Sequence, residues 1–300
     1  GFNVMLSFLN GPNVYATLAG LGQSRVKVVV SERWMFEDGP LSLPAWLRYQ
    51  VYRFADAITV NSRHQHERIA RKFGWSEKRL VTIWNGVDLG RYQSQKPAQS
   101  GSREEISLLA VGTVVPWKNA YRLIEGLSKA RAKGARLRID WAGKVTPDEQ
   151  SRGEHARCEA LLDELKLRDS WRWLGECSEM HELYGNYDAL IHPSVKEGLP
   201  NAVCEGLASG LPVLASTIGD HPLIVKNDLN GWLFDPQDSD SIAEALLKIF
   251  QSSPEQREGM ARESRQLAES KLAIDRLVDD YERLFTGLFE NRTEQFSWDH

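Results

Sequence analysis

The sequence has no long apolar run and only three cysteines, and its first residues do not resemble a secretory signal peptide. No window reaches about 18 uninterrupted apolar residues, the length that a membrane-spanning helix needs. The three cysteines (Cys158, Cys177 and Cys204) are odd in number and widely spaced, so they fit neither a disulfide framework nor a zinc motif. The opening residues, GFNVMLSFLN, lack the basic segment and cleavage site of a signal peptide. We therefore expect a cytoplasmic protein with reduced cysteines.

The composition is that of a globular protein with an uneven charge. The chain has 300 residues, 42% apolar and 26% charged, enough for two domains with their own cores. Residues 1–100 hold 13 Lys+Arg against 7 Asp+Glu, whereas residues 101–300 hold 24 against 34. A basic first part favours an anionic partner, such as phosphate groups or the inner face of a membrane, although a chance split of surface charge gives the same numbers. We expect no nucleic-acid partner.

Apolar strand-like runs alternate with helical patterns along the chain. The predicted strands cover residues 2–8, 26–30, 57–60, 80–83, 107–111, 135–141, 171–174, 189–192 and 212–215. The predicted helices cover residues 13–21, 43–54, 62–73, 120–132, 155–167, 178–184, 201–209, 239–251, 254–269 and 273–289. In the helix over residues 43–54, we expect Trp46, Tyr49, Val51 and Phe54 mostly on one side. Regular β/α alternation is typical of parallel sheets covered by helices.

A polar segment at residues 85–105, rich in Gly, Ser, Gln and Pro, divides this alternation. We therefore predict an α/β protein with two facing doubly wound, Rossmann-like domains. The first spans residues 1–92 and has only about four strands, so we expect it to be truncated or short. Residues 93–105 form the linker and residues 106–270 the second domain. Residues 271–290 form a C-terminal helix, for which a crossing back to the first domain is one expected course, and residues 291–300 form a tail.

The loop VGTVVPWKN, residues 111–119, follows a predicted strand of the second domain. It contains Gly112 and Thr113, and Lys118 stands where the next helix begins. A helix N-terminus favours anions, so a lysine there is poorly placed unless a phosphate binds to both the ammonium and the helix amides. A solvated surface lysine is the alternative.

The loop HPSVKEGLP, residues 192–200, follows the strand over residues 189–192. Glu197 precedes Gly198, Leu199, Pro200 and Asn201, where a helix begins, and the free amides there form an anion site. Glu205 lies one turn inside that helix. The two glutamates can therefore accept hydrogen bonds from hydroxyls on either side of a bound diphosphate. Glutamates eight positions apart are also common for structural reasons alone. The loop at residues 215–222 supplies further phosphate donors or is only a tight turn.

Three stretches together resemble a known family. Residues 193–216, PSVKEGLPNAVCEGLASGLPVLAS, are similar to the signature of retaining GT-B glycosyltransferases of the group 1 type (glycogen-synthase-like, family 4). NGWLFDPQDSDSIAEAL, residues 230–246, resembles the next segment of that family. Residues 54–92 resemble the end of its first domain and the Asn-Gly-Val-Asp linker. The resemblance covers nearly the whole chain and implies the GT-B fold.

The resemblance also implies roles for individual residues. Glu197 matches the glutamate that contacts the hydroxyls of the donor hexose, and Glu205 the one that holds the nucleotide ribose. Lys118 matches the lysine that neutralises the leaving diphosphate, and residues 198–201 match a loop whose amides meet the sugar or the phosphates. Gly112 and Thr113 lie in the donor site, but the family usually has Arg where this sequence has Thr113. Half of the usual cationic clamp is therefore absent, with Arg33 and Arg63 as candidate substitutes.

The implied activity is transfer of a hexose from a nucleotide-diphosphate sugar, with UDP-sugar expected, to a glycan or lipid-linked acceptor with retention. Lys118 and Glu197 are the catalytic candidates, with no metal or other cofactor required. Asp238 and Asp240 resemble a metal motif but stand at a helix start, where Asp and Ser cap. Glu32 and Arg33 are candidate acceptor contacts. A non-catalytic nucleotide-sugar-binding subunit and a GT-B-fold sugar epimerase are the alternatives.

Overall fold

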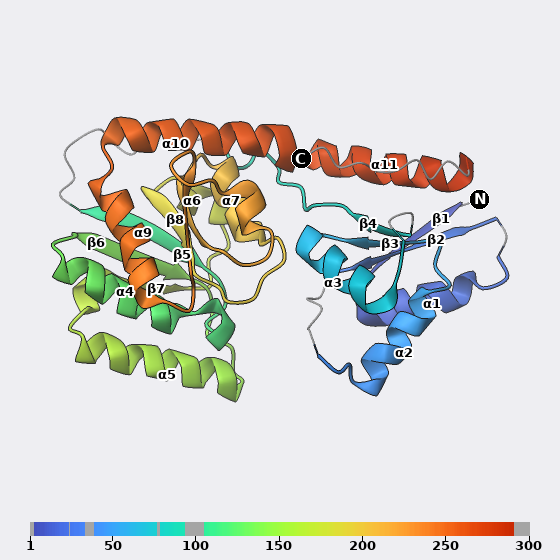
Figure 1. Ribbon diagram of the computed structural model, residues 1–300, viewed down its shortest axis with the longest axis horizontal. Helices are drawn as coiled ribbons and strands as arrows, with labels where there is room; N and C mark the ends of the chain where they lie inside the picture. Colours follow the sequence, from blue (N-terminus) through green and yellow to red (C-terminus); the bar gives the residue numbers. More distant parts are fainter. Residues whose placement is uncertain (1–2, 24, 34–38, 77–78, 94–104, 291–300) are drawn as a thin grey trace. The chain divides into compact units, whose positions relative to one another are not determined.

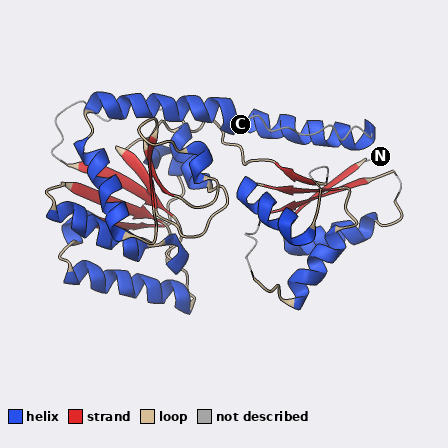
Figure 2. Ribbon diagram, in the orientation of Figure 1, coloured by secondary structure: helices blue, strands red, loops and turns tan. Residues whose placement is uncertain are grey.

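The computed structural model describes residues 3–23, 25–33, 39–76, 79–93 and 105–290. In it the chain divides into two compact units, one of Gly1–Gly86 with Ile274–His300 and the other of Val87–Ala273 (Figure 1). Each unit contains one parallel β-sheet covered by helices (Figure 2). No helix in the described part of the chain is long and apolar enough to cross a membrane.

The first unit has a sheet of four parallel strands in the order β1-β2-β3-β4. These are β1 (Val4–Phe8), β2 (Lys27–Glu32), β3 (Ala57–Val60) and β4 (Leu80–Thr82). Helices α1 (Asn10–Gly20), α2 (Leu43–Tyr52) and α3 (Arg63–Phe73) pack on the face that carries Val28 and Val30. Helix α11 (Ile274–Glu290) packs on the face that carries Val29. Successive residues of β2 thus enter two different cores, because side chains alternate across a strand.

The second unit has six parallel strands in the order β10-β9-β8-β5-β6-β7. They are β5 (Ile106–Val111), β6 (Leu137–Ala142), β7 (Trp171–Gly175), β8 (Ala189–His192), β9 (Val213–Ser216) and β10 (Gly231–Phe234). Helices α4 (Ala120–Ala132), α5 (Glu149–Glu164) and α9 (Ser239–Gln251) enclose the main core on one face. The other helices are α6 (Met180–Tyr184), α7 (Asn201–Ala208), α8 (His221–Ile224) and α10 (Pro254–Leu267). Of these, α7 lies on the opposite face, where Gly206 approaches Leu190 closely.

The α/β fold class is confirmed, and three details of the sequence prediction are wrong. Strand β10 was not predicted, because its four residues read as part of a turn. Helix α5 begins at Glu149 rather than at residue 155, because the side chain of Asp148 caps it by accepting from the Ser151 amide. In α2 the expected common side does not exist, because Tyr49 is buried whereas Trp46 and Phe54 are exposed.

The units divide at Gly86/Val87 and at Ala273/Ile274, whereas the predicted boundaries are at residues 92 and 270. The C-terminal helix α11 belongs to the first unit by its packing. Its Tyr281, Leu284 and Leu288 join the core formed by one face of the four-stranded sheet.

Candidate functional site

The strand order of the second unit determines where a ligand fits. After β5 the chain adds β6 and β7 on one side, and then returns to place β8, β9 and β10 on the other. The loops after β5 and β8 therefore diverge from neighbouring strands, and doubly wound sheets bind ligands at such a switch point. Lys118 lies in the loop after β5, and Glu197 lies in the loop after β8. The fold thus brings together two residues that are 79 positions apart in the sequence.

The loop after β5 fixes the direction of Lys118. A Cβ atom on Gly112 would lie 3.1 Å and 3.2 Å from Cδ and Cε of Lys118, so glycine leaves room for the lysine stem to pass. A single 3₁₀ turn, Pro116–Lys118, ends at Asn119 in the left-handed conformation (φ 66°). The Asn119 amide donates to the carbonyls of Pro193 at 3.0 Å and Pro236 at 2.8 Å. Asn119 therefore connects the loops that follow β5, β8 and β10.

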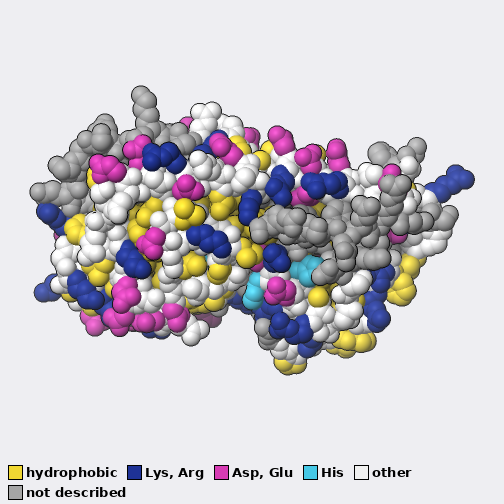
Figure 3. All heavy atoms as spheres, turned by 45° about the horizontal axis from the view of Figure 1, so that its top comes forward, with side chains coloured by type: hydrophobic (Ala, Val, Ile, Leu, Met, Phe, Trp, Pro, Cys, Tyr) yellow, Lys and Arg dark blue, Asp and Glu magenta, His cyan; other side chains and the backbone are white. Residues whose placement is uncertain are grey.

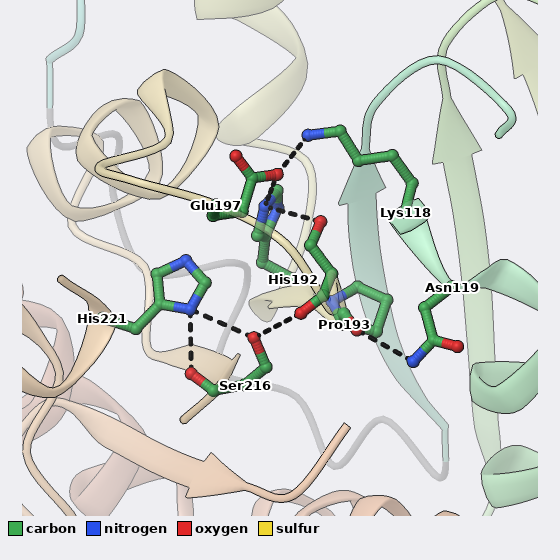
Figure 4. A network of polar contacts seen from close by, with 8 residues as sticks. Lys118, Asn119, His192, Pro193, Glu197, Ser216 and His221 are labelled. Carbon is green, nitrogen blue, oxygen red and sulfur yellow. Dashed lines mark hydrogen bonds and ion pairs between the residues drawn. The ribbon is translucent and has the colours of Figure 1, made fainter. Parts of the chain in front are cut away.

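One oxygen of Glu197 accepts two hydrogen bonds (Figure 4). Its Oε1 lies 2.5 Å from Nζ of Lys118 and 3.1 Å from Nε2 of His192. The side chains of Lys118 and Glu197 are 20% and 15% exposed, so the ion pair is only partly accessible to solvent. Both described contacts fall on Oε1, so Oε2 keeps its capacity to accept from a sugar hydroxyl.

A buried chain of polar groups lies behind Glu197 (Figure 4). Ser194 Oγ lies 3.1 Å from His192 Nε2, and Ser216 Oγ donates to the Ser194 carbonyl at 2.7 Å. His221 Nδ1 donates to the Ser216 carbonyl at 2.8 Å, and the two imidazole rings meet edge to face at 5.4 Å. Because Nε2 of His192 faces a carboxylate, this nitrogen carries the proton of the neutral ring. These polar contacts thus hold His192 in the orientation in which its Nε2–H donates to Glu197.

The charges of this cluster follow from burial and contact. Burial lowers the pKa of His192 and lowers the pKa of His221 to about 3, so both rings are neutral at pH 7. Burial alone would raise the pKa of Glu197, but the hydrogen bond from His192 and the charge of Lys118 hold it well below its usual range. Glu197 is therefore ionised at neutral pH, and Lys118 balances its charge.

The loop after β9 presses against the backbone of Glu197 and Gly198. Gly219 has φ +60°, and a Cβ there would lie 2.4 Å from both of their carbonyl oxygens. The Asp220 amide donates to the Gly198 carbonyl at 2.9 Å. The hydroxyl of Ser216 already donates to a backbone carbonyl. Of the two interpretations of residues 215–222, the geometry supports the tight turn, which braces the glutamate loop.

Glu205 lies one turn inside α7, which begins at Asn201 after the buried Leu199 and Pro200. Its Oε2 accepts from the Tyr184 hydroxyl at 2.9 Å, and burial raises the pKa of Glu205. Burial, and then the neighbouring Glu205, raise the pKa of Tyr92 to about 12. Two tyrosines from distant segments therefore surround this carboxylate. Its role as a ribose ligand stays a prediction.

The candidate acceptor residues belong to the first unit. Glu32 ends β2 but is fully buried, with its carboxylate 3.5 Å from the Tyr49 hydroxyl and 3.8 Å from Nε of Arg48. Because its side chain is fully buried, the structure does not support the expected contact between Glu32 and an acceptor. Although Glu32 is a polar residue at the end of a parallel strand, it is buried and contacts side chains of α2.

Arg33 is held by its own unit. It donates to the Ser31 hydroxyl at 2.8 Å, to the Tyr281 hydroxyl at 3.2 Å and to the Asn85 side chain. Arg63 is exposed at the start of α3. Whether either arginine completes the cationic clamp stays a prediction. Trp34, Met35 and Phe36, a cluster that fits membrane contact but is more often part of an apolar core, lie outside the described residues.

Within the described ranges, no group of three or more His, Cys, Asp or Glu side chains is arranged to hold a metal ion. Asp238 caps α9 by accepting from the Asp240 amide at 2.9 Å. The helix-cap interpretation of that motif is therefore confirmed.

Sequence reasoning missed several residues that build this site. His192 is a polar residue at the end of the apolar run ALIH, immediately before the glutamate loop, and that position was a usable signal. Asn119 adjoins Lys118 and reads as an ordinary helix cap. Tyr92 and Tyr184 carry no local signal, because only the fold brings them to Glu205.

Comparison with known proteins places this arrangement in a family. Residues 93–267 match the model of glycosyl transferases group 1, and residues 2–91 match that of Glycosyltransferase Family 4. The first match covers more than half of the chain. The chain therefore belongs to the glycosyl transferases group 1 family.

Individual relatives are distant. The chain is 27% identical over 291 residues to the exopolysaccharide phosphotransferase SCO2592 of Streptomyces coelicolor, covering 94% of this chain and 28% of that protein. It is 25% identical over 244 residues to the D-inositol 3-phosphate glycosyltransferase of Saccharomonospora viridis, covering 77% of this chain and 56% of that protein. The chain thus spans about half or less of the length of these relatives.

A solved structure, Anabaena HepE in complex with UDP and glucose, aligns with a TM-score of 0.83 at 17% identity. The alignment covers 95% of this chain and 78% of that chain. At this identity the likeness shows the fold, which is the GT-B fold with a smaller sheet in the N-terminal unit.

Proposed function

We propose that the protein transfers a hexose from a UDP-sugar to a glycan or lipid-linked acceptor, with retention of anomeric configuration, in polysaccharide or glycoconjugate biosynthesis. The observation that carries this proposal is the Lys118–Glu197 pair at the switch point of the six-stranded sheet. Family membership and the UDP and glucose bound by the similar Anabaena protein support the choice of donor.

Each group has one task in this proposal. Glu197 accepts a hydrogen bond from a hydroxyl of the donor hexose through Oε2, because Oε1 already accepts hydrogen bonds from Lys118 and His192. Lys118 has three N–H donors, so it can keep Glu197 and still donate to a phosphate. The backbone amides of Gly198, Leu199 and Asn201 donate to the diphosphate, and Glu205 accepts hydrogen bonds from the ribose hydroxyls.

The chemistry needs stabilisation of a departing charge. The bond between the anomeric carbon and the diphosphate oxygen breaks, and its electron pair leaves with UDP. The acceptor oxygen bonds to the same carbon, and its proton passes to the departing diphosphate. A fixed cation and oriented amides stabilise that diphosphate without reorganisation, so the proposal assigns neither a metal nor a covalent nucleophile.

We further propose that the protein acts at the cytoplasmic face of a membrane, where lipid-linked acceptors are found. The excess of basic residues in the first 100 residues of the chain supports this location. Arg33 remains a candidate acceptor contact, whereas the buried Glu32 is a weak one.

The second candidate is a nucleotide-sugar-binding subunit without activity. Thr113, which stands where the family usually has Arg, favours this alternative. A panel of UDP- and GDP-sugars with glycan and lipid-linked acceptors separates the two. Release of nucleoside diphosphate with a glycosylated product supports the transferase. Donor binding without release from any donor would support the binding subunit.

A further inference from the structure

Helix α2 is apolar on two opposite faces. Tyr49 and Tyr52 point inward, and Tyr49 stacks on Phe73 in the core of the first unit. On the other side Leu43, Trp46 and Leu47 are 46% to 68% exposed, and the exposed Phe54 lies in the turn after the helix. A helix on the surface of a protein normally presents polar side chains to water. The outward side of α2 instead presents three large apolar side chains to solvent.

Helix α1 also carries exposed apolar side chains. It packs beside α2, where the Tyr52 hydroxyl donates to the Asn10 carbonyl at 3.5 Å. Its Tyr15, Leu18 and the following Leu21 are also exposed. The exposed apolar residues of both helices are here called the docking face: Tyr15, Leu18, Leu21, Leu43, Trp46, Leu47 and Phe54.

The part of the chain that contains the docking face has an excess of cations. Within residues 3–73, the described part holds nine Lys and Arg but only three acidic residues. Of the acidic side chains, Glu32 is buried, Asp56 pairs with Lys27 at 3.0 Å and Glu67 lies on α3.

Cations also flank the helices. Lys72 donates to the Gly39 carbonyl just before α2, and the exposed Arg53 follows α2. The exposed Arg25 follows α1. Basic and apolar side chains lie together along the lower rim of this unit in Figure 3. Exposed aromatic and leucine side chains flanked by arginines are typical of proteins that lie on a membrane surface.

We propose that the docking face binds the surface of a bilayer that contains anionic lipids, with its leucine and aromatic side chains in the headgroup region and Arg25, Arg53 and Lys72 on lipid phosphates. A second copy of the chain would bring like charges together, which disfavours self-association through this face. The proposal deepens the membrane location proposed above, but it does not depend on transferase activity, because binding is measured without a donor.

The test is cosedimentation of the 300-residue protein with vesicles of phosphatidylcholine, with and without 30 mol% phosphatidylglycerol, at about 0.1 M salt. We expect binding to the anionic vesicles and little to the neutral ones. The variant R25E/R53E should bind at least about 25-fold more weakly, because each arginine near an anionic surface contributes about fivefold. Its matched control is R152E/K133E, which reverses two exposed charges of the second unit and should bind normally.

A second set of variants tests the apolar part. L43S/W46S/L47S should lose at least tenfold in vesicle affinity, whereas V145S/L229S, which alters exposed apolar residues of the second unit, should not. Unfolding temperatures within a few degrees of the parent show that the variants fold. Equal binding to neutral and anionic vesicles, or parent-like binding by either docking-face variant, would overturn the proposal. So would a dimer that L43S/W46S/L47S abolishes, because the face would then be a protein interface.

Discussion

Replacing Lys118 by methionine removes the cation at the switch point and keeps most of the side-chain volume. The substitution has two separable effects. The transition state loses the group that faces the departing diphosphate, and the ground state loses the partner that lies 2.5 Å from Glu197. Removing one preorganised donor of this kind costs about 2.7–4 kcal/mol in the barrier, so we expect turnover to fall about 100- to 1,000-fold.

The cost in stability lies between two limits. An exposed ion pair contributes up to about 1 kcal/mol, and breaking a fully buried pair costs about 3–5 kcal/mol. The exposures of 20% and 15% place this pair between them, and His192 still donates to the carboxylate. The Lys118→Met variant should therefore fold, with a free energy of unfolding lower by about 1–3 kcal/mol.

The assay is UDP release at saturating donor and acceptor, with urea unfolding in parallel. Lys144→Met is the matched control, because Lys144 also follows a strand of the same sheet and pairs with Glu176 at 3.0 Å, but in an exposed position. We expect the control to keep parent-like turnover and stability, and Lys118→Arg to recover part of the activity. Unchanged turnover in Lys118→Met would refute the role assigned to Lys118.

Three further predictions concern the residues around Glu197. His192→Leu should lower kcat/KM about 10- to 100-fold, because it removes a hydrogen bond to a charged group. His192→Gln keeps an N–H donor and should recover much of the lost kcat/KM. Equal losses of kcat/KM in the two variants would contradict a donor role for His192. The pKa of His221 is lowered to about 3 by burial, so the unfolded chain binds a proton below pH 6.5 that the folded protein does not. The free energy of unfolding of the parent protein should therefore fall by up to about 1.4 kcal/mol per pH unit as the pH is lowered from 6.5 towards 3. In His221→Gln, urea melts should show a weaker dependence of this free energy on pH. Gly219→Ala should lower both the unfolding temperature and turnover. Gly74 has a similar φ of +64° but no atom within 4 Å of the added Cβ, so Gly74→Ala should lower stability alone. Equal effects of the two variants on turnover would contradict the claim that the Gly219 loop supports the position of Glu197.

The fold follows from the sequence where the pattern is local and repeated. The β-branched run that forms β2 and the starts of α3 and α4 lie close to their predicted positions, because alternation of strands and helices constrains them together. The start of α5 was missed, because the Asp148 cap outweighs a weak apolar pattern. The outer face of α2 could not be assigned, since apolar residues on both sides of a helix do not reveal which side is buried.

The site is predictable only in its linear motifs. Lys118 and Glu197 were expected in one donor site because each follows a parallel strand, and the strand order brings their loops together. Their direct ion pair was not foreseen. The polar contacts that connect His192 with Ser216 and His221 depend on the backbone carbonyls of Ser194 and Ser216. No sequence spacing predicts such contacts. The burial of Glu32 depends in the same way on packing against α2.

The central claim is that the carboxyl edge of the six-stranded sheet, between β5 and β8, binds the UDP of a nucleotide-sugar donor. Calorimetric titration of UDP into the parent protein and into Glu205→Gln tests it directly. Glu205 lies on α7 with Tyr184 as its partner and is proposed to hold the ribose; the substitution keeps the side-chain shape while removing the charge that is to accept hydrogen bonds from the ribose hydroxyls. The account predicts saturable binding of one UDP by the parent and at least tenfold weaker binding by the variant. No binding of UDP to the parent, or equal binding by both proteins, would contradict it.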